Sequence, residues 1–321
     1  FQIFIGKILK PIRHLFPPLV TGIVVLMIGV SLLKVGFMYA GGGAWLMNNK
    51  PEIFGNANHL TIAFTVLIVS LFFNIKGKGM WSSASILIGM IAGYIVAMAL
   101  GMVNYGKIAS ADWFALPMPL QYGIDFVPGA IILMLFMAVV TTIETIGDIS
   151  ATTMGGDNRE ATDKELSGGI MADGVGTAFG ALFNAMPNTS YSQNAGLVAF
   201  TGVVSRHVGT VAGVLLILMG LFPKLGGIIA SMPESVIGGA AIIMFGLIAS
   251  AGIKLIAREQ MNQRNLLILG LSLSFGIGMS LLPQFVKHIP DLGISLKLLL
   301  TTGLIPAGML AFILNAIMSK K

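Results

Sequence analysis

Two acidic side chains lie four residues apart within a long apolar stretch of the chain. The segment "TTIETIGDIS" carries Glu144 and Asp148. Residues four apart share one face of a helix, and an acid at membrane depth costs about 2.5 to 3.5 kcal/mol on insertion scales. Two acids on one face therefore predict a polar cavity within the membrane. The alternative is that the helix ends before Asp148, which then lies in a loop together with Asp157.

A third acid, Asp173, follows in the segment "GGIMADGVGTAFGALF". Gly and Ala allow helices to approach closely, so this segment is predicted to pack tightly, and Asp173 is a third candidate for the acidic cluster. The alternative is an acid at a helix end that caps the backbone.

The stretch "PNTSYSQNAG", from Pro187 to Gly196, places hydrogen-bonding side chains between two apolar regions. Pro187 is expected to end a helix, and a new one is expected to begin near Gln193 with Ser192 as its N-cap. A broken helix preceded by a short extended segment near 187–193 would aim free N–H groups at a ligand. The amides of Gln193 and Asn194 suit a planar ligand with amide edges. A re-entrant loop with a purely structural role is the alternative.

The elements that hold these residues must lie in a membrane. Hydrophobic residues make up 55% of the 321 residues, charged residues 10%, and mean hydropathy is +0.90, whereas soluble domains are roughly 25% charged. A spanning helix needs about 20 apolar residues, and the composition predicts an all-α polytopic membrane protein. The ten predicted spanning segments are 17–38, 58–74, 80–103, 126–150, 165–186, 193–204, 208–231, 234–255, 264–283 and 296–318.

The distribution of Lys and Arg predicts the orientation of these segments in the lipid bilayer. If the segments alternate across the membrane, 13 of the 19 Lys and Arg residues fall on one side. Cytoplasmic loops are enriched in these residues, so both ends of this chain are predicted to be cytoplasmic. The net charge of +6 is scattered among loops, which favours a role in orientation over nucleic-acid binding.

An internal repeat is visible in the two stretches "FPPLVTGIVVLMIG", from Phe16, and "MPESVIGGAAIIMF", from Met232. By the charge distribution, the first copy enters the membrane from the cytoplasm and the second from outside. Inverted repeats are a common transporter construction. The alternative is a chance match, because Pro is frequent at helix starts.

The remaining motifs do not support a cofactor. No Gly-rich run is followed by Lys-Ser or Lys-Thr, so a phosphate-binding loop is not predicted. The four His residues lie near segment ends without a partner at ligand spacing, and the lack of Cys rules out thiolate metal sites. We therefore expect no metal and no organic cofactor.

At these motifs the chain resembles the nucleobase/ascorbate transporter family (nucleobase:cation symporter-2), and within it the bacterial xanthine and uric acid permeases. The family signature is Gln or Glu, Asn, any residue, Gly, four further residues and Thr, which here reads "QNAGLVAFT" from Gln193 to Thr201. The motifs "ETIGD", "ADG" and "FNAMPNTSYSQN" are similar in order and spacing to the family's pattern. The resemblance extends from about Phe4 to the C-terminus.

The resemblance implies a fold of fourteen spanning segments in two inverted sets of seven. A core domain would hold the substrate, and a gate domain would pack as a homodimer. On that pattern this chain carries the fifth to fourteenth segments, and four are expected before Phe1, where no initiator Met stands. The implied division is a cytoplasmic lead-in at 1–16, a gate at 17–122 and 232–318, a core at 123–231 and a cytoplasmic tail at 319–321.

The resemblance also implies roles for single residues. Glu144 would hydrogen-bond ring N–H groups of a purine, and Gln193 would pair with another edge of the base. Tyr191 and Ser192 would complete the substrate site, with Ser192 contributing mainly its backbone. The residues that would shape the broken helix are Asn194, Gly196 and Thr201.

We therefore expect a symporter, not an enzyme, in the inner (plasma) membrane. It would import a purine together with a proton as the coupling ion, with xanthine as the first choice and uric acid as the second. The core would move against the gate to give alternating access. Glu144, Asp148 and Asp173 would link protonation to substrate binding.

Three alternatives remain open at this point. One is a permease for uracil or another nucleobase. Another is an anion transporter of the same architecture, although such a protein would more naturally lack an acid such as Glu144 beside the substrate. The last is an intramembrane aspartyl protease with Asp148 and Asp173 as a catalytic pair, but "TIGD" lacks the first Gly of the pattern that such proteases resemble.

Overall fold

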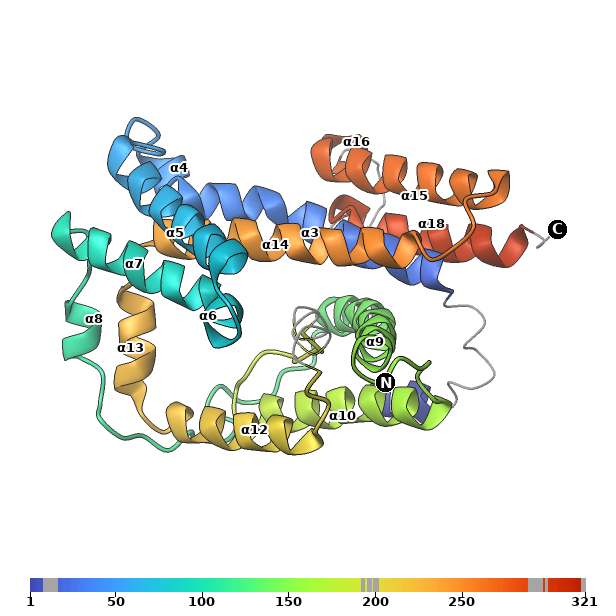
Figure 1. Ribbon diagram of the computed structural model, residues 1–321, viewed down its shortest axis with the longest axis horizontal. Coiled ribbons are helices and arrows are strands. Elements are labelled where there is room, and N and C mark those ends of the chain that lie inside the picture. The colour runs from blue at the N-terminus through green and yellow to red at the C-terminus, as the bar shows by residue number, and fades with distance from the viewer. Residues whose placement is uncertain are drawn as a thin grey trace. The chain divides into compact units, whose positions relative to one another are not determined.

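The computed structural model describes residues 1–7, 17–191, 194, 198, 202–287, 297 and 300–318. Every regular element within these ranges is an α-helix (Figure 1). The chain divides into two compact units, which comprise Phe1–Ser31, Met118–Val204 and Leu247–Lys321 in the first, and Leu32–Pro117 and Ser205–Gly246 in the second.

Each unit collects helices that are distant in the sequence. The first contains α1 (Gln2–Lys7), α9 (Pro128–Asp157), α10 (Asp163–Leu182), α15 (Gln263–Leu281), α16 (Gln284–Lys287) and α18 (Leu304–Ile317). The second contains α4 (Ala44–Asn49), α5 (Ala57–Lys76), α6 (Met80–Ser83), α7 (Ser85–Ala99), α8 (Gly106–Ala109), α12 (Arg206–Gly220) and α13 (Pro223–Ser231). Two long helices, α3 (Pro18–Ala40) and α14 (Glu234–Ile256), each contribute one end to either unit.

Five helices, α3, α5, α9, α14 and α15, are long and apolar enough to cross a membrane. They correspond to the predicted segments 17–38, 58–74, 126–150, 234–255 and 264–283. The protein is therefore an all-helical polytopic membrane protein, as the composition predicted. The predicted segment 193–204 lies largely outside the described residues, as does the start of 296–318.

The predicted segment 208–231 is not one straight helix, because the structure breaks it into α12 and α13, which meet at 85°. Pro223 stands in the first turn of α13. Pro lacks the N–H that would continue a helix and clashes with the preceding turn, so α12 ends and a new helix begins in another direction. The described residues thus hold five candidate spans, or six if this bent pair crosses as one.

The predicted segment 80–103 also differs from the structure. A single turn of helix, α6, precedes α7, and the chain turns at Ala84 between them. The helix α7 ends at Ala99, with Leu100 as its C-cap, and Gly101 follows with a φ of 68°. Glycine adopts this left-handed conformation without a steric penalty, and it often terminates helices.

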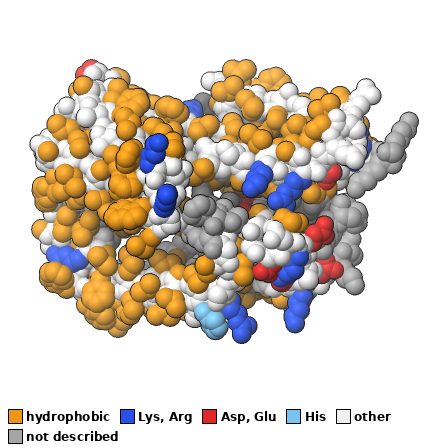
Figure 2. Space-filling view, in the orientation of Figure 1, with side chains coloured by type: hydrophobic (Ala, Val, Ile, Leu, Met, Phe, Trp, Pro, Cys, Tyr) orange, Lys and Arg blue, Asp and Glu red, His pale blue; other side chains and the backbone are white. Residues whose placement is uncertain are grey.

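The helices of the second unit expose their largest apolar side chains. Phe64, Ile68 and Phe72 on α5 are 54%, 61% and 58% exposed, and Leu87 and Ile95 on α7 are exposed to a similar degree. Hydrophobic side chains cover much of the surface visible in Figure 2. Extended exposed apolar surface marks contact with lipid or protein, which agrees with a membrane environment.

Small residues bring α5 and α7 together. Gly89, Gly93 and Ala97 occupy one face of α7 and are buried. A methyl group added at Gly89 would lie 2.6 Å from the backbone oxygen of Val66 and would also collide with the Ser70 hydroxyl. Small residues spaced four apart allow helix backbones to approach in a membrane, and this face is the α5 contact of α7.

Two glycines of the predicted repeat occupy related positions in α3 and α14. A methyl group added at Gly22 of α3 would lie 2.9 Å from the backbone nitrogen of Ile256, near the end of α14. One added at Gly238 of α14 would collide with the backbone of Ala40, at the end of α3. The helices are antiparallel, and each carries its glycine near its own start. This reciprocity agrees with an inverted repeat, which remains a prediction, as does the division into core and gate.

Candidate functional site

The acidic pair lies on α9, inside the first unit. The helix begins with Pro128 in its first turn and continues to Asp157, after which Asn158 takes a left-handed conformation with φ of 52°. Glu144 and Asp148 are one turn apart in the middle of this helix, and Asp148 is only 8% exposed. Asp148 therefore belongs to the helix and not to the loop.

The third acid, Asp173, reaches the same place from α10. The hydroxyl of Thr145, which follows Glu144 in the sequence, donates a hydrogen bond to the Asp173 carboxylate. The two helices approach closely here, because a methyl group added at Gly169 of α10 would collide with Ile149 of α9. The structure thus brings together the three acids that the sequence singled out.

An extended segment at residues 185–190 follows α10 and supplies hydroxyl groups to the acids. Thr189 Oγ1 donates to Glu144 Oε2 at 3.3 Å, and Ser190 Oγ donates to Asp148 Oδ2 at 2.5 Å. The chain leaves the helix through Asn184, which has a φ of 62°. The helix α10 ends at Leu182, earlier than the predicted end at Pro187, and the extended segment lies against α9. The predicted start of a new helix near Gln193 lies outside the described residues.

A second contact fixes this segment on α10. Thr177 Oγ1 donates to Asn188 Oδ1 at 2.8 Å, and the backbone N–H of Asn188 donates back to Thr177 Oγ1 at 3.3 Å. A methyl group added at Gly176 would lie 3.0 Å from the amide of Asn188, so the small residue makes room for it. The Thr177–Asn188 contact positions Thr189 and Ser190 over the acids.

The other predicted site residues are either exposed or outside the described residues. Tyr191 is 53% exposed, and Asn194 is also exposed. Four predicted residues of the substrate site and broken helix lie outside the described residues, namely Ser192, Gln193, Gly196 and Thr201.

Sequence reasoning missed the hydroxyl residues that contact the acids. Thr145 precedes Asp148 by three residues, and a residue three positions away lies on the same helix face. That spacing is the signal that would have found it. Thr189 and Ser190 were part of a recognised polar stretch, but their partners depend on how α9 and α10 pack. Thr177 gives no signal, because its partner Asn188 is 11 residues away across a turn.

A network of charged residues holds the turn between α9 and α10. Thr162 and Glu165 form a capping box at the start of α10. Arg159 binds Glu165 through both guanidinium nitrogens, at 2.8 and 2.6 Å. The pKa of the exposed Glu165 carboxyl is well below its usual range, mainly because Arg159 donates hydrogen bonds to it and secondly because Thr162 does. The network fixes the register in which the two acid-bearing helices emerge from the turn.

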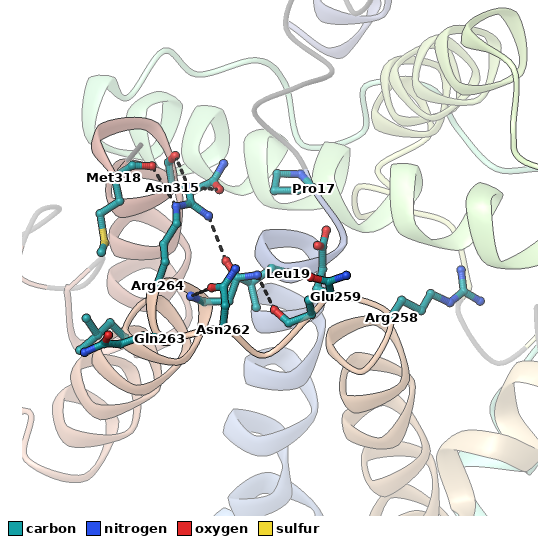
Figure 3. A pocket seen from close by; sticks show the side chains of 12 residues that line it. Pro17, Leu19, Arg258, Glu259, Asn262, Gln263, Arg264, Asn315 and Met318 are labelled. Atoms are coloured by element: carbon teal, nitrogen blue, oxygen red, sulfur yellow. Dashed lines mark hydrogen bonds between the residues drawn. The ribbon is translucent and has the colours of Figure 1, made fainter. Parts of the chain in front are cut away.

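A cavity of about 800 Å³ lies elsewhere in the first unit, near the turn between α14 and α15 (Figure 3). Arg264 donates to the backbone oxygens of Asn315 and Met318, at 2.8 and 2.9 Å, and to the side chain of Asn265 at 3.0 Å. A cation at the C-terminal carbonyls of a helix is stabilising. Arg264 therefore holds the end of α18, and Glu144, Asp148 and Asp173 do not line this cavity. The cluster of Glu144, Asp148 and Asp173 is therefore the better candidate for the functional site.

Within the described part of the chain, no group of three or more His, Asp or Glu side chains is arranged to hold a metal ion. The acids instead have hydroxyl partners, which can donate or accept a proton. The arrangement suits hydrogen bonding to a polar ligand.

These features define a polytopic membrane protein with a polar site built between its helices and an interrupted helix. A family profile described as "Permease family" matches residues 1–285. The chain belongs to this permease family. It is therefore a membrane transporter, and the family assignment made from the sequence motifs is confirmed.

Similar proteins cover nearly the whole chain. A protein of Clostridium perfringens, named provisionally as a purine permease, is 38% identical over 100% of this chain and 69% of its own length. The xanthine permease XanP of Escherichia coli is 36% identical over 98% of this chain and 68% of its own length. The uric acid transporter UacT of Escherichia coli is 36% identical over 97% of this chain and 64% of its own length.

Proposed function

We propose that this protein imports a purine nucleobase together with a proton, with xanthine as the first choice of substrate and uric acid as the second. The names of the similar proteins support a nucleobase substrate of this class. The observation that carries the proposal is the contact between the acids of α9 and the extended segment that leads to Gln193 and Asn194.

The proposed recognition follows from the chemistry of an oxidised purine, which presents ring N–H donors and carbonyl acceptors around a flat ring. A carboxylate accepts hydrogen bonds from N–H groups, and an amide can donate to a carbonyl and accept from an N–H. Glu144 would accept from the ring, and Gln193 would pair with another edge. The hydroxyl of Thr189, which donates to Glu144 in the structure, would be replaced by the substrate N–H.

The proposed coupling follows from the crowding of negative charge. Glu144, Asp148 and Asp173 are gathered where α9, α10 and the extended segment meet. Like charges that share a small volume titrate together, and a bound proton relieves their repulsion. A proton taken up with the neutral purine would therefore stabilise the loaded site and link uptake to the proton gradient.

The remaining parts of the proposal concern the whole protein. We place it in the inner membrane with both ends of this chain in the cytoplasm, because Lys and Arg concentrate on that side of the predicted topology. A core that moves against a dimeric gate would give alternating access.

The proposal is tested by uptake of labelled xanthine in cells that lack their own purine permeases and express the complete native protein. We expect accumulation that is abolished by a protonophore and reduced by excess uric acid but not by excess uracil. Uptake that resists the protonophore would contradict proton coupling. Uptake blocked by uracil would favour the uracil alternative, and inhibition by sulfate but not by purines would favour the anion alternative.

A further inference from the structure

Two hydroxyl groups lie between two of the acids. Thr145 Oγ1 donates to Asp173, and Ser190 Oγ donates to Asp148 Oδ2 at 2.5 Å. The oxygens of the two hydroxyls are 3.5 Å apart. Because a hydroxyl carries one hydrogen, Ser190 donates to Asp148 when that acid is ionised, and to Thr145 when Asp148 is protonated and itself donates to Ser190. With Asp148 protonated, the four groups stand in one series of donors and acceptors, namely Asp148, Ser190, Thr145 and Asp173.

Three separate elements contribute to this series. Asp148 and Thr145 stand on α9, Asp173 stands on α10, and Ser190 belongs to the extended segment. The Thr177–Asn188 contact holds the extended segment against α10. The series is therefore complete only when the extended segment lies close to α9.

We propose that Ser190 and Thr145 pass a proton between Asp148 and Asp173, and that the position of the extended segment switches this path on and off. The inference rests on the proposed function, because it assigns a path to the coupled proton. When Asp148 is protonated, its proton moves to Ser190 Oγ, and the Ser190 proton moves to Thr145 Oγ1. The Thr145 proton then moves to Asp173. Both hydroxyls end neutral, Asp148 becomes a carboxylate and Asp173 becomes a carboxylic acid.

The distances locate the switch between the two hydroxyls. A separation of 3.5 Å is longer than an ordinary O–H···O hydrogen bond of about 2.5 to 3.0 Å, whereas both hydroxyl contacts to the acids are short. A shift of the extended segment by a fraction of an ångström toward α9 would complete the path, and a shift away would interrupt it. Because the same segment leads to Gln193, substrate binding there would control the path.

An acid and a neutral amide also lie near the proton path. Glu144 on α9 is the third acid of the cluster, and it accepts from Thr189 of the extended segment. From α1, Gln2 donates to Thr141 Oγ1 at 2.9 Å, so this helix brings a neutral amide to α9. Glu144 can exchange a proton with the substrate site, while the Thr145–Ser190 path connects the two aspartates.

The test uses the complete native protein, purified and reconstituted into proteoliposomes. Thr145→Val removes one hydroxyl at nearly constant volume, Thr145→Ser restores it, and Ser190→Ala removes the other hydroxyl. Thr142→Val is the matched control, because Thr142 is also on α9 and, like Thr145, 2% exposed. The Thr142 hydroxyl donates to the backbone oxygen of Ala138 at 2.6 Å, within its own helix.

Two transport modes separate the proton path from substrate binding. Exchange of labelled for unlabelled xanthine, without a pH gradient, needs binding and conformational change but no net proton movement. Accumulation of labelled xanthine driven by an inward proton gradient needs net proton movement, which a luminal pH dye records. We expect Thr145→Val and Ser190→Ala to retain exchange and to lose gradient-driven accumulation by about 100-fold, the usual scale of a lost proton-transfer group. Thr145→Ser and Thr142→Val should accumulate xanthine as the wild type does.

The outcomes distinguish this inference from the proposed function. Wild-type protein that transports no purine, or transports it without proton movement, would overturn the proposed function. Wild-type coupling that persists in Thr145→Val or Ser190→Ala would overturn the proton path alone. Equal loss of exchange and accumulation in these variants would assign the hydroxyls to substrate binding, and the proton path would again be wrong. If Thr145→Val fails to fold, Ser190→Ala decides the question.

Discussion

Hydroxyl donors make it possible to keep carboxylates inside the helical part of this protein. Asp148 is only 8% exposed, and burying an ionised carboxylate without partners is very costly. A hydrogen bond to a charged group contributes about 1.5 to 3 kcal/mol net, and Ser190 supplies one at 2.5 Å. The hydrogen bond therefore stabilises both partners: it offsets the burial of the Asp148 carboxylate, and it holds the extended segment against α9.

Glu144 is the residue whose charge the proposed mechanism needs most. Glu144→Gln keeps the size of the side chain and its hydrogen bond with Thr189 but cannot bind and release a proton. We expect this variant to lose proton-driven accumulation of xanthine by about 100-fold or more, the scale expected for a general acid or base. Glu160→Gln, which changes an exposed acid in the turn before α10, is the control and should transport normally. Full accumulation by Glu144→Gln would refute its role in coupling.

The acids could be predicted from the sequence, whereas their hydroxyl partners could not. A carboxylate in an apolar helix costs so much that Glu144, Asp148 and Asp173 stand out in the sequence. Thr and Ser carry little penalty in such helices, because their hydroxyls can bond to the preceding turn, as Ser150 does at 2.7 Å. Which hydroxyl faces an acid depends on packing between helices, and a single sequence does not contain that information.

At the scale of elements, the stripe of small residues on α7 replaces the hydrophobic effect as the reason for its contact with α5. Lipid tails are as apolar as leucine, so close packing must hold membrane helices together. Gly89 and Gly93 allow that packing against Val66 and Ser70. The exposed leucines and isoleucines of α7 face outward and contribute little to the pairing.

Gly89→Leu should separate α5 from α7. Even a methyl group at this position would lie 2.6 Å from the backbone oxygen of Val66, and backbone cannot move aside as a side chain can. Overpacking of this kind costs about 1 to 3 kcal/mol, so we expect a lower melting temperature in detergent, measured by loss of the monodisperse chromatographic peak on heating. Gly270→Leu, at a position with no atoms within 4 Å of an added methyl group, should melt like the wild type. Equal melting of both variants would mean that the glycine contact is unimportant.

Long apolar helices could be predicted because the length of an uninterrupted apolar run in the sequence gives the length of the helix. The bend between α12 and α13 could not be predicted in the same way, since residues 208–231 are largely apolar and only Pro223 and the neighbouring Lys224 mark the break. Proline inside an apolar segment either kinks a helix or starts a new one. The partners that satisfy the freed backbone groups decide which occurs. Here the backbone N–H of Ala115 donates to the backbone oxygen of Leu221, between α12 and α13, at 3.1 Å.

At the scale of the whole molecule, labelling of introduced cysteines tests the predicted orientation, because residues 1–321 contain no Cys of their own. Glu52 and Glu160 are exposed acids in turns predicted to lie outside and inside the cell. In intact cells, a membrane-impermeant maleimide should label Glu52→Cys and not Glu160→Cys, and permeabilised cells should show labelling of both. Labelling of Glu160→Cys in intact cells would reverse the predicted orientation.

The number of spans is the property of the whole molecule that hydropathy defines least well. Ten segments were predicted, and the described residues contain five helices of spanning length and one bent pair. Shorter apolar helices such as α7 and α18, with 15 and 14 residues, are about 21 to 23 Å long at 1.5 Å per residue. They fall short of the hydrocarbon thickness of about 30 Å, so length alone does not decide whether they cross.

The glycine contacts between α3 and α14 have a mechanical consequence. Where Gly238 meets α3, the atoms nearest to an added methyl group belong to the backbone of Tyr39 and Ala40, with no side chain between the two helices that could change rotamer or be compressed. A contact between backbones, without side chains that can rearrange, transmits a displacement of one helix to the other almost unchanged. Within the second unit, the end of α3 and the start of α14 are therefore expected to stay rigid, and bending there would fall on segments without this contact, such as residues 221–222.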